Sequence, residues 1–197
     1  MLEKEVEWLT KAQAGDGDAF GQLVETYQIP VFNLCYRMLG NAQEAEDAAQ
    51  ETFLRAYNSM KSYDRQKPFS TWLLSIAAHY SIDQIRRRRM TLVPFEALPY
   101  QDLPDLAPTP EAAVTKIEEQ RRVRDLLETL SPTDRAVVVM YYWHDLSYTQ
   151  IAEALDLTES AVKSRLHRAR VEMAKSWTYQ SSRHSIQERS QNGSPAF

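Results

Sequence analysis

The sequence is poor in cysteine and glycine. Its one cysteine, Cys35, cannot form an internal disulfide, and such sparse use of cysteine fits a reducing compartment, so we expect a cytoplasmic protein. Cys35 follows Leu34 in an apolar helical stripe, which favours a small buried hydrophobe over a nucleophile. Only five glycines are present, and few β-branched residues alternate with polar ones. This composition predicts an all-α fold.

Long hydrophobic runs and catalytic signatures are also missing. The longest uninterrupted apolar stretch, residues 136–143, is eight residues long, which is too short to cross a bilayer, so we expect no membrane insertion. The first residues do not resemble a signal peptide. The four histidines are scattered, and we find neither a Gly-rich phosphate loop nor a nucleophile elbow. We therefore expect no metal site, no cofactor and no enzymatic activity.

The chain lacks the basic excess that is usual for an autonomous DNA-binding protein. Its formal net charge is −4, whereas such proteins obtain most of their affinity from a strongly basic surface. Positive charge is most concentrated in two short places, Arg86–Arg89 and Lys163–Lys175. A chain that is acidic elsewhere can borrow affinity from a larger partner that already holds the DNA.

Residues 146–170 predict two helices around a tight turn, the pattern of a helix-turn-helix. Ser147 can cap the first helix, and Gln150 follows three residues later, as a capping box requires. Asp156 lies at the break, where the chain often needs a positive φ and glycine is favoured. Thr158 can cap the second helix.

The second of these helices has two distinct sides. Its predicted buried stripe follows the i, i+4, i+7, i+11 pattern and consists of Val162, Leu166, Ala169 and Met173. Small polar and cationic side chains lie opposite this stripe or at its edges: Ser160, Lys163, Ser164, His167, Arg168 and Arg170. Such a face suits a major groove, where Lys and Arg meet phosphates or guanine. A solvated basic helix on another helical domain is the alternative.

A helix predicted from about residue 41 to 60 has an acidic side. Small apolar residues form its core stripe, and the opposite side carries Glu46, Asp47, Gln50, Glu51 and Leu54. This side is either a solvated acidic face or a docking surface for a basic partner.

The next predicted helix, residues 69–90, combines aromatic and cationic groups. Its polar sector contains Trp72, Ser75, His79, Asp83 and Arg86. Aromatic rings beside cations suit single-stranded nucleic acid, because stacking contributes about 1–3 kcal/mol per base. Packing of Trp72 against the preceding loop is the alternative.

The chain is expected to form two small helical domains joined by a linker. The predicted parts are residues 1–90, a first domain; 91–110, a Pro-rich acidic linker; 111–176, a second domain with the helix-turn-helix; and 177–197, a Ser- and Gln-rich tail expected to be disordered.

Three motifs, in this order and at this spacing, are specific enough to suggest a family: Glu44–Tyr57, Phe69–Ala78 running into Asp83 and the arginines, and Leu146–Arg170. With them, the chain resembles the extracytoplasmic-function (group IV) sigma factors of bacterial RNA polymerase, in the sigma-70 family. The resemblance covers nearly all of residues 18–176. It implies that the first domain is sigma region 2 and that the second is sigma region 4.

The resemblance also implies partners and site residues. The clamp helices of the largest polymerase subunit would contact Glu46, Asp47, Gln50, Glu51 and Leu54. The minus-10 promoter element would be melted and read by Lys67, Trp72, Ser75, His79, Tyr80, Asp83, Arg86 and Arg87. The minus-35 element would be read by Ser160, Lys163, Ser164, His167 and Arg168. The flap of the second-largest polymerase subunit and an anti-sigma factor are further expected partners, and the free chain is expected to be a monomer.

Two other kinds of protein compete with this interpretation. An autonomous helix-turn-helix regulator would share the C-terminal half, but it leaves the acidic helix, the surface from Trp72 to Arg89 and the acidic linker unexplained. A helical scaffold would use residues 46–51 for protein contact alone. Co-purification with core RNA polymerase distinguishes a sigma factor from both.

Overall fold

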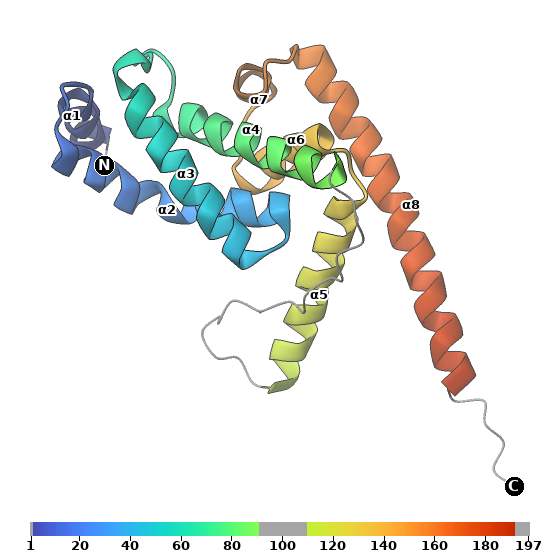
Figure 1. Cartoon of the computed structure of the whole chain (residues 1–197). Helices are drawn as coiled ribbons and strands as arrows, with labels where there is room; N and C mark the ends of the chain where they lie inside the picture. Colours follow the sequence, from blue (N-terminus) through green and yellow to red (C-terminus); the bar gives the residue numbers. More distant parts are fainter. Residues whose placement is uncertain (1, 91–109, 192–197) are drawn as a thin grey trace, which may run out of the picture.

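The protein is built from helices packed in two groups. The structure is a computed structural model, and it describes residues 2–90 and 110–191. The helices are α1 (Leu2–Gln13), α2 (Gly17–Leu39), α3 (Ala42–Ser59), the 3-10 turn η1 (Met60–Ser62), α4 (Phe69–Met90), α5 (Pro110–Glu128), α6 (Pro132–Trp143), α7 (Tyr148–Ala154) and α8 (Glu159–Gln191) (Figure 1). In the described ranges every regular element is helical, as predicted, and none is long and apolar enough to cross a membrane.

The first group consists of α1 to α4, which pack around α2. Asp16 caps α2 by accepting a hydrogen bond from the Ala19 amide (3.0 Å), and Asn41 caps α3 by accepting one from the Glu44 amide (3.0 Å). The predicted small stripe of α3 is buried, and it comprises Ala45, Ala48, Ala49, Thr52 and Ala56. Helix α2 continues through Pro30 to Leu39, so the proline does not interrupt it.

Helix α2 ends at Gly40, which has a left-handed backbone (φ 76°). Glycine adopts this conformation without steric cost. A Cβ atom at this position would also lie 3.1 Å from Glu128 Oε1 of α5. The end of α2 therefore lies directly against the C-terminal half of the chain.

The second group consists of α5 to α8 and contains the predicted helix-turn-helix. Ser147 and Gln150 form the full capping box at the start of α7. Asp156 in the turn has a φ of 53°, as its position predicted. Thr158 accepts a hydrogen bond from the Ala161 amide (3.1 Å) and so caps α8. The predicted stripe of α8 is buried at Val162, Leu166 and Ala169 and partly buried at Met173.

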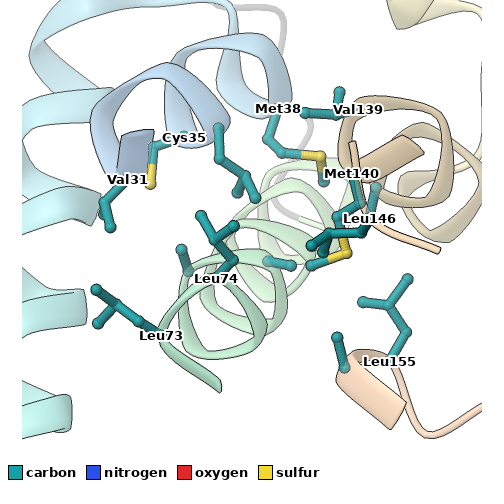
Figure 2. Packing of buried hydrophobic residues seen from close by; sticks show 14 of the residues in the cluster. Val31, Cys35, Met38, Leu73, Leu74, Val139, Met140, Leu146 and Leu155 are labelled. Atoms are coloured by element: carbon teal, nitrogen blue, oxygen red, sulfur yellow. The ribbon is translucent and has the colours of Figure 1, made fainter. Parts of the chain in front are cut away.

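The two groups share one hydrophobic core. Helix α6 packs on α2 and α4, and α7 packs on α4. Figure 2 shows Met38 of α2 close to Val139 and Met140 of α6, within a single cluster that also includes Leu74 of α4. At the same junction, Arg135 Nη1 of α6 donates a hydrogen bond to the Met38 carbonyl oxygen (2.6 Å).

Helix α8 is longer than the sequence predicted. It was expected to end near residue 176 and to be followed by a disordered tail, but it continues to Gln191. Residues 177–191 contain neither proline nor glycine, and their Arg, Gln and Glu residues favour helix, so nothing in this stretch terminates it. Residues 192–197 and most of the predicted linker lie outside the described residues.

His144, the C-cap of α6, lies at the junction of the two groups. The pKa of His144 is lowered to about 4, mainly by burial and also by the nearby Arg37 of α2, whereas Asp145 acts in the opposite direction. The folded protein therefore keeps His144 neutral at pH values where an unfolded chain, with a histidine pKa near 6.5, would protonate it.

We predict that this histidine makes the protein less stable as the pH falls from about 6.5 to about 4. Below pH 6.5 the unfolded chain binds a proton that folded His144 does not, so the free energy of unfolding decreases by at most about 1.4 kcal/mol per pH unit. Urea unfolding at pH 7 and pH 5 should show a smaller pH-dependent loss for His144→Gln than for wild type. His167→Gln is the matched control because His167 is exposed. An equal loss in all three proteins would contradict the prediction.

Candidate protein and nucleic-acid interfaces

The acidic face, defined as Glu46, Asp47, Gln50, Glu51 and Leu54, lies on the outer side of α3. Four of its side chains are exposed, and Leu54 retains 56% of its surface although it is apolar. Glu51 is less free, because its carboxylate accepts a hydrogen bond from Arg55 Nε (2.7 Å). The Arg55 guanidinium in turn lies over the Tyr80 ring of α4 (4.8 Å). The face thus combines free carboxylates with an exposed leucine, which suits a basic, partly apolar partner.

The α4 surface comprises Lys67, Trp72, Ser75, His79, Tyr80, Asp83, Arg86 and Arg87. Of these, the side chains of Lys67, His79, Asp83, Arg86 and Arg87 are exposed, and the other three are partly buried. Two polar groups are held by the helix itself: Ser75 Oγ donates to the Trp72 carbonyl (2.7 Å), and His79 Nδ1 lies 2.8 Å from the Ser75 carbonyl. Arg86 is 3.9 Å from Asp83. The helix therefore presents a row of polar groups that ends in cations.

Trp72 lies nearer to the core than we expected for a residue that stacks on the bases of single-stranded nucleic acid. Its ring packs at 4.9 Å from Tyr63 and 5.6 Å from Phe69. The loop before α4 supplies Tyr63, so the alternative of packing against this loop is correct for the chain in this structure. The indole is still only partly buried.

The α8 surface comprises Ser160, Lys163, Ser164, His167 and Arg168, and all five side chains are exposed. They lie on the side of α8 opposite the buried Val162 and Leu166. Arg165, between them in sequence, turns away and forms an ion pair with Asp134 of α6 (2.7 Å). This pair fixes how α8 lies on α6, so the five polar groups form one outward face.

An aromatic ladder beside the α8 surface did not emerge from the sequence. Tyr141 and Tyr148 stack almost parallel (5.4 Å, 14°), and Lys163 Nζ lies 5.5 Å over the Tyr148 ring. At the other end, Arg170 lies over Tyr141 (5.9 Å) and donates to the Tyr142 hydroxyl (2.8 Å). The ladder therefore holds two cations of α8 before any ligand is present. Tyr141 and Tyr148 lie on two different helices, and the two cations lie on a third, so no local sequence pattern indicated this ladder.

The structure also brings the α4 surface next to the helix-turn-helix. His79 Nε2 lies 3.8 Å from Asp156 Oδ2 in the turn, and Gln150 Nε2 of α7 donates to Thr71 Oγ1 of α4 (3.5 Å). The acidic face is not part of this contact. In the described part of the chain, no three His, Cys, Asp or Glu side chains gather as a metal site requires.

Two family models match the chain. The model of sigma-70 region 2 matches residues 23–91, and that of sigma-70 region 4 matches residues 120–173. The ECF RNA polymerase sigma factor SigW of Bacillus subtilis (strain 168) is 37% identical over 182 residues, which are 89% of this chain and 96% of SigW. The ECF RNA polymerase sigma factor SigE of Mycolicibacterium smegmatis (strain ATCC 700084 / mc(2)155) is 34% identical over 79% of this chain and 60% of its own length.

Solved structures share the fold. CnrH, in complex with the cytosolic domain of CnrY, superposes with a TM-score of 0.68 at 23% identity, covering 89% of this chain and 98% of that one. The sigma factor RpoE from Bartonella quintana, in complex with the anti-sigma factor NepR, gives a TM-score of 0.61 at 18% identity, covering 79% and 94%.

We predict that Tyr148 positions Lys163 for contact with DNA. Replacing Tyr148 with Leu removes the ring under the ammonium, and an exposed cation–π contact contributes about 0.5–1 kcal/mol, so affinity for a promoter duplex should fall about two- to fivefold. Tyr148→Phe keeps the ring and should bind like wild type. In a Lys163→Met background, Tyr148→Leu should cause no further loss. An undiminished effect in that background would show that the ring acts independently of Lys163.

Proposed function

Because the chain belongs to the extracytoplasmic-function sigma factors of the sigma-70 family, we propose how its own residues divide the work of a sigma factor. A sigma factor binds core RNA polymerase and directs promoter recognition, DNA melting and initiation. The proposed division assigns residues 1–90 to core binding and the minus-10 element, and residues 111–176 to the minus-35 element. Residues 91–110 connect them.

The acidic face is the proposed contact with the clamp helices of the largest polymerase subunit. Its support is that the carboxylates of Glu46 and Asp47 are exposed and that Leu54, which is apolar, is exposed on the same helix. Glu51 adds negative charge to the acidic face, and its salt bridge to Arg55 fixes the orientation of the Glu51 carboxylate. This face is the observation on which the proposal mainly depends, since an autonomous DNA-binding regulator has no use for it.

The α4 surface is the proposed reader of the unpaired minus-10 strand. The exposed His79 and the cations that follow it can meet flipped or unstacked bases and the phosphates between them. Because Trp72 is packed against Tyr63 and is only partly buried, its proposed role is to form one side of this surface.

The α8 surface is the proposed reader of the minus-35 element. A helix that lies in the major groove reads bases with short polar side chains and holds phosphates with cations. Ser160 and Ser164 suit the first task, whereas Lys163, His167 and Arg168 are long enough for either. The aromatic ladder holds the Lys163 ammonium group over the Tyr148 ring, which positions it for contact with DNA.

Further partners follow from the same assignment. We propose that the chain also contacts the flap of the second-largest polymerase subunit and that an anti-sigma factor holds it inactive, since one solved structure that shares its fold is of the sigma factor RpoE in complex with the anti-sigma factor NepR. The proposed role requires no catalytic group, metal or cofactor of the chain's own, because the polymerase performs the nucleotidyl transfer.

We predict that Asp47→Lys combined with Glu51→Lys abolishes binding to core polymerase and leaves helicity unchanged. The exchange places two cations where the partner is basic, and both side chains lie outside the core. Co-purification with core polymerase measures the loss, and circular dichroism checks the fold. The matched control reverses two exposed acidic residues on other helices, Glu25→Lys with Glu172→Lys. Unchanged co-purification of the first variant, or equal loss in the control, would contradict the assignment.

We also predict that the free chain binds promoter duplex weakly and melts it only with core polymerase. Its net charge is −4, and non-specific contacts of this kind reach only about 10⁻⁴ to 10⁻⁶ M. Permanganate should therefore modify minus-10 thymines only when core polymerase is present, and His79→Ala should reduce the modification. Tight sequence-specific binding by the free chain, without thymine reactivity in the presence of core, would favour an autonomous regulator.

A further inference from the structure

Helix α1 contributes no residue to the three proposed surfaces, and it lies before residues 23–91, which the region 2 model matches. It is nevertheless a packed element. Leu9 and Ala12 are buried in the core, and the Tyr27 hydroxyl of α2 donates a hydrogen bond to Glu5 Oε1 (2.6 Å). Figure 1 shows α1 at the end of the first group where α3 ends and α4 begins, and α1 contacts η1 there. Its last turn therefore lies beside the loop that leads into α4.

This loop, residues 63–68, carries Lys67 of the α4 surface. All the residues from Asp64 to Pro68 are exposed. The backbone between them forms a tight turn, because Asp64 Oδ1 accepts a hydrogen bond from the Gln66 amide (2.9 Å) and the Asp64 carbonyl accepts one from the Lys67 amide (3.1 Å). The loop is thus ordered although most of its side chains face solvent.

Tyr63 connects the loop to Trp72. Its ring is buried and packs 4.9 Å from Trp72 and 5.4 Å from Phe69. The Tyr63 hydroxyl donates a hydrogen bond to the Lys67 carbonyl. A displacement of Tyr63 would therefore move both the support of the Trp72 ring and the backbone of Lys67. Trp72 and Lys67 belong to the α4 surface that we propose as the reader of the minus-10 strand.

Gln13, the last residue of α1, holds the backbone of Tyr63. Its Nε2 donates one hydrogen bond to the Tyr63 carbonyl (2.8 Å) and another to the Met60 carbonyl (3.3 Å). A second contact lies close by, because Arg65 Nη2 donates to Thr10 Oγ1 in the same turn of α1 (2.6 Å). Helix α1 thus fixes the loop at its start and near its middle.

We propose that Gln13 is a positioning residue for promoter reading: it holds the 63–68 loop in the conformation in which Lys67 can meet the unpaired minus-10 strand beside Trp72. This role rests on the proposed function of the α4 surface. A loop that is ordered before DNA arrives does not lose its conformational freedom on binding, so less of the binding free energy is spent on ordering it. A mobile loop would also accept different bases more equally, so the contact supports selectivity as well as affinity.

Gln13→Glu tests the contact with almost no change in side-chain shape. It replaces the amide donor by a carboxylate that faces two carbonyl oxygens. One hydrogen bond changes an equilibrium constant by a factor of about two to ten, so the loss of both should raise the open population of the loop on the order of tenfold. Gln13→Lys keeps a donor and should behave like wild type.

The matched control is Gln28→Glu. It makes the same change of charge at an exposed glutamine of α2, whose Nε2 donates to the Glu25 carbonyl of its own helix (3.4 Å). It should leave both the loop and promoter reading unchanged.

Limited trypsin digestion of the full-length free chain measures opening of the loop. Trypsin cleaves after Arg65, whereas the proline that follows Lys67 prevents cleavage there. Proteolysis follows the open population when opening and closing are fast compared with cleavage. Cleavage after Arg65, measured by mass spectrometry relative to cleavage after Lys175 of α8, should rise on the order of tenfold for Gln13→Glu. It should stay at the wild-type rate for Gln13→Lys and Gln28→Glu.

The complex with core polymerase then tests promoter reading. Permanganate reactivity is measured at thymines shared by a promoter that wild type opens and by versions with single substitutions in the minus-10 or the minus-35 element. For Gln13→Glu, the preference for the unsubstituted minus-10 element should fall about two- to tenfold, and the preference for the unsubstituted minus-35 element should not change. A mere loss of folded protein would lower reactivity on every promoter and leave both preferences as they are.

Two results would overturn the proposal directly. Unchanged cleavage after Arg65 in Gln13→Glu would show that Gln13 does not hold the loop. An unchanged minus-10 preference despite faster cleavage would show that the position of the loop does not affect reading. Equal effects of Gln28→Glu, or a failure of Gln13→Lys to behave like wild type, would also contradict it.

Two further outcomes are separated by the design. If Gln13→Glu does not fold by circular dichroism, Gln13→Met removes the donor without adding a charge and replaces it in both assays. If wild type itself does not bind core polymerase or does not distinguish minus-10 variants, the proposed function fails and the minus-10 role of Gln13 fails with it. The digestion of the free chain would still decide whether Gln13 holds the loop.

Discussion

The structure depends on how the last turn of α2 satisfies its backbone carbonyls. A helix leaves its final carbonyls without partners inside the helix, and here the C-cap residue and arginines from two other helices bond the carbonyls at the end of α2. The Gly40 amide bonds the Tyr36 carbonyl (2.8 Å), Arg88 of α4 reaches the Leu39 carbonyl (3.5 Å), and Arg135 of α6 takes the Met38 carbonyl (2.6 Å). One helix end thus joins the long helix of the N-terminal half to the C-terminal half. Without Arg135, burying α6 on α2 would leave a carbonyl exposed to an apolar environment.

Local chemistry made most of the fold predictable. Caps at Asn41, Ser147 and Thr158, the positive φ at Asp156 and the buried stripes of α3 and α8 all follow from interactions within about one helical turn. The helical periodicity that identifies the buried stripe of a helix also identifies its opposite, solvent-exposed side. For this reason the exposed members of the acidic face and of the α8 surface could be named from the sequence.

Contacts between distant segments could not be predicted in this way. Nothing near Arg135 in the sequence indicates that it is buried against a carbonyl 97 positions away, and the ladder of Tyr141, Tyr148 and Lys163 depends on how α6, α7 and α8 cross. The packing of Trp72 could not be predicted for the same reason. Its spacing places it among polar residues, but Tyr63 of the preceding loop packs against its ring. The end of α8 was missed for a different reason, since a polar composition alone does not distinguish a solvated helix from a disordered tail.

Helix α8 has a mechanical consequence. Its 33 residues form a rod about 50 Å long at 1.5 Å per residue, and its second half extends beyond the helices that surround the first (Figure 1). The rod is anchored near its start by the Arg165–Asp134 pair. A rotation of a few degrees at this pivot therefore moves the free end by several ångströms. The helix works as a lever arm, so a force applied far from the helix-turn-helix is transmitted to it as a torque.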